Sequence, residues 1–182
     1  MVSDWLSSMA VSTELSNFTE GLDTDVAFVN QATGEAIGVA ETGIVSFGGP
    51  FVNPIVKYAE TTSTTANQAP IRFQTNGSDY LFTYSNGTPV PDATLPMSVI
   101  NDDQDMFVIE VYRDSNERNL MLSYGFGWQG TYAAGKYFDQ MIYPDLAAYN
   151  ISWIIVKWED TNGNGFVNNP ADGDAYTVIA YG

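Results

Sequence analysis

SWIIVKWEDTNGNGFV, residues 152–167, joins a nearly continuous apolar run to a polar loop rich in oxygen-bearing side chains. The run from Trp153 to Trp158 and a second run from Ala175 to Tyr181 have the composition of β-strands. Neither run alternates between apolar and polar residues, and this predicts burial on both faces of a sheet. The loop between the two strands is the main candidate for a functional site.

The rest of the chain predicts more strands and two helices. The main helix, at about 131–142, has Ala134, Tyr137 and Phe138 on one apolar face, and a short helix at about 52–60 follows a Gly-Gly-Pro break. Strands are predicted at 25–29, 43–47, 71–74, 80–84, 106–112 and 119–124, with a proline-rich link at 89–96. A chain of 182 residues accommodates one such domain. The fold class expected is therefore mixed α/β and β-rich, with a mixed sheet.

The domain boundary is expected near residue 24. Residues 1–24 are polar and weakly patterned, which favours an extended segment or one donated to the open sheet edge of a neighbouring molecule. Residues 25–182 are then expected to form a single globular domain.

The charge balance excludes several classes of partner. The chain has 22 acidic against 6 basic residues, a net charge of −16, and its Lys and Arg are scattered. Nucleic acids and anionic membrane surfaces need clustered basic residues, so neither is expected as a partner. No apolar run approaches the roughly 20 residues that span a bilayer. Divalent cations, by contrast, would relieve the self-repulsion of the folded chain.

The absence of histidine and cysteine narrows the possible chemistry. The sequence contains neither residue, which removes thiolate and Ser-His-Asp catalysis and the usual zinc sites. A bound metal would have to be held by oxygen atoms, as calcium or magnesium are. With no nucleophile and base identifiable, no enzymatic activity is expected.

The loop after Trp158 resembles a calcium-binding pattern. Asp160, Asn162 and Asn164 occupy its first, third and fifth places, Gly165 the sharp sixth place, and the Phe166 carbonyl the seventh. The twelfth place holds Ala171 where a bidentate Glu is expected, so Asp172 or Asp174 would have to replace that acid. The alternative is an empty Asn-Gly-rich turn between two strands. Calcium binding is the favoured interpretation.

Two glycine-rich turns each follow a predicted strand and precede a predicted helix. GFGWQG at 125–130 fits the dinucleotide fingerprint, but Trp128 stands where the backbone should approach phosphate, and too little chain follows for further βα units. FGGPFVNP at 47–54 supplies Asn53, which is placed to cap the short helix. We interpret both stretches as structural turns.

Four N-x-[ST] sequons favour an exported surface protein. They begin at Asn17, Asn76, Asn86 and Asn150, and each is a candidate site of N-glycosylation.

Three segments in this order are similar to the C-terminal part of archaeal surface-layer glycoproteins. They are FGGPFVNP (47–54), YGFGWQGTYAAGKYF (124–138) with its YPDL exit, and WEDTNGNGFV (158–167), and the resemblance covers about residues 43–182. It implies an extracellular structural protein that tiles the cell surface, is exported and N-glycosylated, and depends on divalent cations. By the same resemblance the glycines of 48–49 and 125–130 are scaffold residues.

The function expected is therefore that of an archaeal cell-envelope protein, located at the cell surface. It would self-associate into a lattice or filament, with calcium ordering the loop. The alternative is a carbohydrate-binding or adhesive module, because eleven Tyr and four Trp supply surfaces on which glycans stack. A glycosidase with two catalytic carboxylates is a third possibility, but the sequence selects no pair among the 22 acids.

Overall fold

A computed structural model describes residues 2–14, 29–35, 37, 43–61, 69–100 and 102–182. Its larger sheet has five strands in the order β1-β6-β5-β7-β8. The strands are β1 (Gly43–Phe47), β5 (Gln104–Arg113), β6 (Asn119–Gly125), β7 (Trp153–Glu159) and β8 (Ala175–Tyr181). Only β1 and β6 pair in parallel and the other neighbours are antiparallel, so the sheet is mixed. The predicted fold class, mixed α/β and β-rich, is confirmed.

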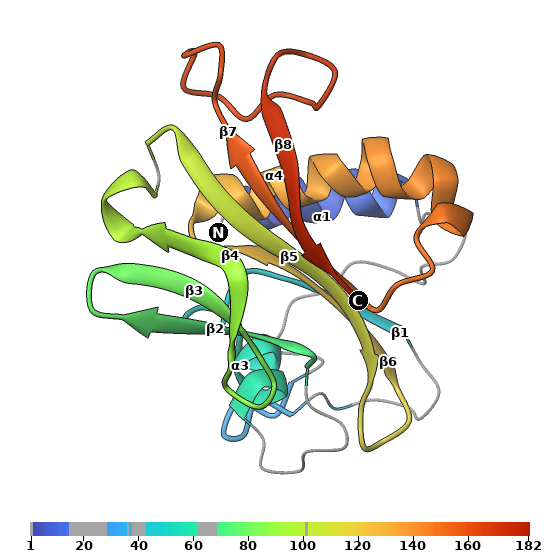
Figure 1. Ribbon diagram of the computed structural model, residues 1–182. Coiled ribbons are helices and arrows are strands. Elements are labelled where there is room, and N and C mark those ends of the chain that lie inside the picture. The colour runs from blue at the N-terminus through green and yellow to red at the C-terminus, as the bar shows by residue number, and fades with distance from the viewer. Residues whose placement is uncertain (1, 15–28, 36, 38–42, 62–68, 101) are drawn as a thin grey trace.

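A second sheet, not foreseen as separate, contains β2 (Ile71–Asn76), β3 (Asp79–Tyr84) and β4 (Pro89–Pro96). It packs with helix α3 (Pro54–Thr61) over one face of the larger sheet (Figure 1). The buried side chains between the two layers form the larger apolar core, which includes Val56, Phe82 and Ile155.

The opposite face of the larger sheet is covered by α1 (Val2–Glu14) and α4 (Trp128–Tyr137), which lie side by side (Figure 1). The chain continues from α4 through η2 (Phe138–Ile142) and η3 (Tyr143–Ala148). Together α4 and η2 occupy the predicted 131–142 helix and begin three residues earlier. The predicted 52–60 helix is α3, displaced by one or two residues.

The N-terminal segment differs from the extended form that its polarity suggests. Residues 2–14 are helical, and Ser7 and Val11 of α1 are buried. A Cβ on Gly135 of α4 would lie 2.5 Å from the Ser7 hydroxyl oxygen, so the missing side chain lets the two helices approach closely. Packing against α4, rather than a strong apolar pattern within 2–14, accounts for the helix. Residues 15–24 lie outside the described part of the chain, as does most of the predicted 25–29 strand.

Two expectations about the strands are wrong. The segment 89–96 is strand β4 rather than a link, because its three prolines lie at the edge of the small sheet, where backbone donors are dispensable. Strand β8 is an edge strand as well, and is not buried on both faces: 43 % of Val178 and 67 % of Tyr181 are exposed. Strand β7 is buried as predicted, since β5 and β8 flank it.

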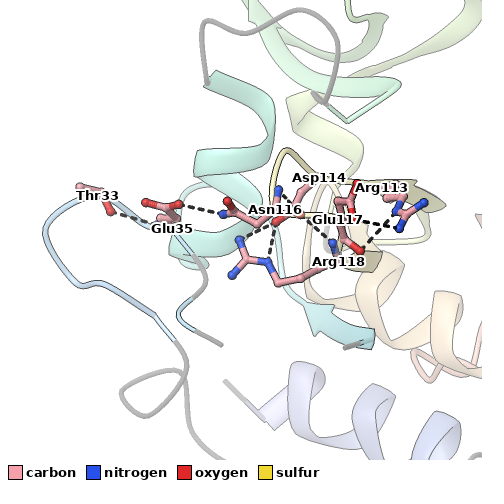
Figure 2. Close-up of polar contacts among 7 residues, drawn as sticks. All are labelled: Thr33, Glu35, Arg113, Asp114, Asn116, Glu117 and Arg118. Carbon is pink, nitrogen blue, oxygen red and sulfur yellow. Dashed lines mark hydrogen bonds and ion pairs between the residues drawn. The ribbon is translucent and has the colours of Figure 1, made fainter. Parts of the chain in front are cut away.

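The β5–β6 hairpin closes around a buried ion pair. The Asp114 carboxylate accepts hydrogen bonds from the Arg118 backbone N–H at 2.9 Å and from its Nε at 2.7 Å. Figure 2 shows the Arg118 guanidinium pointing at Asp114 while Asn116, at the tip, donates to Glu35 of the 29–35 segment. The turn therefore anchors an early segment of the chain against the larger sheet.

Candidate functional site

The loop between β7 and β8 is organised by Asp160. Its carboxylate accepts hydrogen bonds from the backbone N–H groups of Gly163, Asn164 and Gly165, at 2.8, 3.3 and 2.7 Å. Gly163 and Gly165 have φ angles of +68° and +75°, which let the chain curl around the side chain. Asp160 thus organises the loop through backbone hydrogen bonds, and the ion-binding role expected of its position stays a prediction.

The predicted ligands at the third, fifth and seventh places of the loop also accept hydrogen bonds from within the loop. The side-chain oxygens of Asn162 and Asn164 each accept the N–H two residues on, at 3.0 and 2.8 Å. The Phe166 carbonyl accepts a bond from the Asn168 amide at 3.2 Å. Each of these oxygens keeps a second lone pair that its hydrogen bond does not use. The donor set at these positions fits a hard cation.

The two candidate replacements for the twelfth ligand differ. Asp174 is buried and accepts bonds from Trp158 Nε1 and the Asn168 N–H, both at 2.7 Å, and from two side-chain amides. Asp172 is exposed, with a hydrogen bond from the Asn169 amide at 3.0 Å. Asp174 therefore anchors the loop to β7, and Asp172 is the acid with spare coordinating capacity.

A second acidic loop, whose proximity the sequence does not reveal, lies beside this one. The Asp160 N–H donates to the Asp103 carbonyl at 2.8 Å, because Gln104 of β5 pairs with Glu159 of β7. The exposed residues Asp102 and Asp103 thus share one end of the larger sheet with the β7–β8 loop. In the part of the chain that the structure describes, no three or more acidic side chains converge on a metal position. The predicted ion site depends instead on amide and carbonyl oxygens around the carboxylate of Asp160.

The N-terminus of α4, where a dinucleotide phosphate would lie, is occupied by the chain's own Asp105. Its carboxylate accepts the N–H groups of Gly127 at 3.0 Å and Gly130 at 2.7 Å, together with that of Met106 at 2.7 Å. Burial raises the pKa of Asp105 to about 7, and these hydrogen bonds oppose the rise. A Cβ on Gly130 would lie 2.6 Å from the Asp105 carboxyl carbon, so a larger residue at this position would collide with Asp105. GFGWQG is a turn built around an internal carboxylate, and Asp105 is a residue that sequence reasoning missed.

The other glycine-rich turn has the structural role expected of it. Asn53 accepts hydrogen bonds from the Ile55 and Val56 N–H groups at 2.9 and 3.3 Å, so it caps α3 as predicted. Its amide also donates to the Phe47 carbonyl and the Ser46 hydroxyl, both at 2.7 Å. This one side chain fixes α3 to the end of β1.

Three of the four sequon asparagines lie at exposed positions. Asn76 ends β2 at its hairpin turn, Asn86 lies in the β3–β4 turn, and Asn150 precedes β7. Asn17 lies outside the described residues. A glycan at any of the three exposed positions would project from a turn or a strand end.

No family model, curated protein or solved structure matches this chain. No helix in the described ranges is long and apolar enough to cross a bilayer. The function is therefore inferred from the residues themselves and from the resemblance to surface-layer glycoproteins.

Proposed function

We propose that the protein is an extracellular structural protein of the archaeal cell envelope that self-assembles through β8 into a lattice or filament, with calcium ordering the β7–β8 loop. The observation that carries the proposal is the character of this edge strand. β8 contains seven residues without a charge or a proline, in a chain with a net charge of −16. Natural sheet edges usually carry such features to prevent pairing with other molecules.

Two other strand edges in the molecule are closed by identifiable features. Strand β4 has three prolines and a positive φ of 62° at Asp92. Strand β2 gives the N–H groups of Ile71 and Phe73 to carboxyl groups of Glu110 and Glu60. Strand β1, the other edge of the larger sheet, also lacks a charge and a proline but has five residues against seven. Strand β8 therefore offers a second copy of the chain the longer edge that is free of charge repulsion. A β8–β8 pair would be antiparallel and self-complementary, and it would close as a two-fold dimer. A lattice or filament therefore needs a second, different contact between such dimers.

The loop that leads into β8 links calcium to this edge. Asp160, Asn162, Asn164 and the Phe166 carbonyl, with Asp172, supply the oxygen atoms for one ion. A bound ion would neutralise charge next to Ala175, where β8 begins, and so lower the repulsion between two approaching copies. The three exposed sequons and the resemblance support the extracellular location.

Assembly is tested by measuring molecular size with calcium and then with a chelator. With calcium, the wild type is expected to form dimers or larger assemblies, and the Val178→Lys variant is expected to lose the β8–β8 pair and give smaller species, because lysine blocks an edge. Val111→Lys is the matched control: Val111 is 45 % exposed against 43 % for Val178, but it lies on β5, which has neighbours on both sides. A monomeric wild type, or equal assembly of the two variants, would count against the β8 interface.

Calcium binding is tested separately by thermal unfolding. Binding to the folded state alone stabilises it by about 2.7 kcal/mol when calcium is a hundredfold above Kd. Asp160→Ala should lose most of this gain, whereas Asp145→Ala removes the same charge from an exposed position on η3 and should keep it. If calcium raises the melting temperature of Asp160→Ala as much as that of the wild type, the loop is only a turn.

A carbohydrate-binding function is the second candidate, supported by one aromatic cluster. The ring of Phe51 is 76 % exposed and lies 5.1 Å from that of Phe73, which also contacts Tyr80 and Phe126. Exposed aromatic rings of this kind are surfaces on which sugars stack. Binding of a panel of neutral oligosaccharides, lost in Phe51→Ala and kept in Phe166→Ala, would favour this function over assembly.

A further inference from the structure

Three polar side chains are buried where the small sheet meets the larger one. Glu60 of α3 is 5 % exposed, and Glu110 of β5 and Tyr124 of β6 are fully buried. Tyr124 is part of the apolar core between the two layers. Burying a carboxyl group in such surroundings lowers the stability of the fold unless its hydrogen bonds are satisfied or its charge is removed. The positions of the two glutamates therefore need a specific explanation.

The two glutamates bind the outer edge of β2. Glu110 Oε2 accepts the Ile71 N–H at 2.9 Å, and Glu60 Oε2 accepts the Phe73 N–H at 3.1 Å. Alternate N–H groups of an edge strand point away from its partner, so the carboxyl oxygens replace the carbonyls of a missing neighbouring strand. The Tyr124 hydroxyl donates to Glu60 Oε1 and extends the link to β6. The three side chains tie β2 to α3, β5 and β6, and we call them the β2 clasp.

The charges around the β2 clasp do not support two ionised carboxylates. The nearby cation is Arg72 of β2, which attracts Glu60, while Glu60 and Glu110 repel each other. Glu110 Oε1 has no hydrogen-bond partner among the described residues. The other facing groups are Tyr112, from β5, and beyond it Tyr58, Asp114 and Arg118. Burial raises the pKa of Tyr112 and Tyr124, so both tyrosines stay neutral.

We propose that the β2 clasp is a pH-dependent latch, which holds the small sheet on the larger sheet when the glutamates are protonated and releases the β2 edge when they ionise. A protonated carboxyl group still accepts the β2 N–H bonds and carries no buried charge. Ionisation of both groups places two like charges in the core, and they are relieved only if β2 moves away and water enters. This is a conformational property of the domain, independent of whether it assembles through β8.

Burial, the main cause, raises the pKa of Glu60 from 4.5 to about 7 and the pKa of Glu110 well above 4.5. The folded state therefore retains protons that the unfolded state has already lost at the same pH. The stabilising contribution is complete below about pH 4.5 and is lost as pH rises toward 7 and above.

The test is amide hydrogen exchange of Ile71 and Phe73 at pH 5 and pH 8, corrected for intrinsic exchange rates. We expect their protection to fall by at least about a hundredfold between these pH values, since each pH unit inside the window changes the opening equilibrium up to tenfold per group and Glu60 alone spans about two units. The amides of β7 should keep their protection, because that strand lies between β5 and β8. Unchanged protection of the Ile71 and Phe73 amides, or an equal loss of protection in β7, would contradict the proposal.

Neutral variants separate the β2 clasp from the total charge. Glu60→Gln combined with Glu110→Gln keeps both acceptors and removes both charges, so protection of the β2 edge should become independent of pH. Glu117→Gln removes one charge from an exposed position of the β5–β6 hairpin and should retain the wild-type profile. A folded double variant with the wild-type pH profile would also overturn the proposal. If the double variant does not fold, the wild-type exchange profile alone decides.

Discussion

Asp105 and Asp160 organise two glycine-containing turns by the same chemistry in opposite environments. Asp105 accepts the N–H groups of Gly127 and Gly130 in the interior, across 22 and 25 residues of sequence. Asp160 accepts those of Gly163 and Gly165 at the surface, from three and five residues away. The comparison shows that burial sets the energetic importance of such a carboxylate, and separation along the chain sets whether a sequence reveals it.

The energetic difference comes from water. When Asp160 is removed, solvent can reach the loop and satisfy the released N–H groups. Asp105 is fully buried, so its removal would leave the N–H groups of the buried residues Met106 and Gly130 without acceptors in the interior. Asp105 also links the start of β5 to the start of α4, whereas Asp160 links residues of one loop.

Alanine at the two aspartates should give the largest contrast. We expect Asp105→Ala to lower the free energy of unfolding by about 3–5 kcal/mol, because it leaves buried donors unsatisfied. Asp160→Ala, measured in chelator, should cost about 1 kcal/mol, as the loss of an exposed cap does. Urea unfolding at pH 6 measures both values. Equal costs would mean that burial is not what distinguishes the two turns.

The pH dependence of stability should also separate the aspartates. The folded-state pKa of Asp105 is raised from 3.8 to about 7, so its contribution is complete below about pH 4 and is lost as pH rises through 7. Asp105→Asn should therefore reduce the decline of stability between pH 4 and 8 by about 2–4 kcal/mol. Asp145→Asn, which removes the same charge from an exposed position, should leave the decline intact. Thermal unfolding across this range gives the slopes, and identical slopes for the two variants would refute the role of Asp105.

The smallest contrast concerns the glycines. An added methyl at Gly130 would lie within 3 Å of the hydrogen-bonded Asp105 carboxylate, and we expect Gly130→Ala to cost about 2–3 kcal/mol. Gly165 has open space around it, and its φ of +75° makes Gly165→Ala cost about 1 kcal/mol through backbone strain alone. Chemical unfolding of the two variants tests this order. A reversed order would show that the surface loop is the more tightly constrained turn.

Features that depend on neighbours in sequence were predictable from it. Strand β1 was placed at its observed bounds, and the Asn53 cap was predicted because a capping side chain acts within three residues. The alternating oxygens of the Asp160 loop follow the same rule. The prediction of a link at 89–96 was wrong because proline excludes a central strand but not an edge strand. Whether a strand lies at the edge of a sheet depends on residues far away in the sequence.

Composition and local spacing by themselves determined the fold class and the oxygen-rich loop after Trp158. Only the tertiary structure decided that Asp105 occupies the α4 N-terminus, that Asp103 lies beside Asp160, that α1 is a helix, and that Glu60 and Glu110 bind β2. The physical reason is that each of these contacts joins segments far apart in the chain. Such contacts depend on sheet order and burial, and a pattern of neighbouring residues records neither.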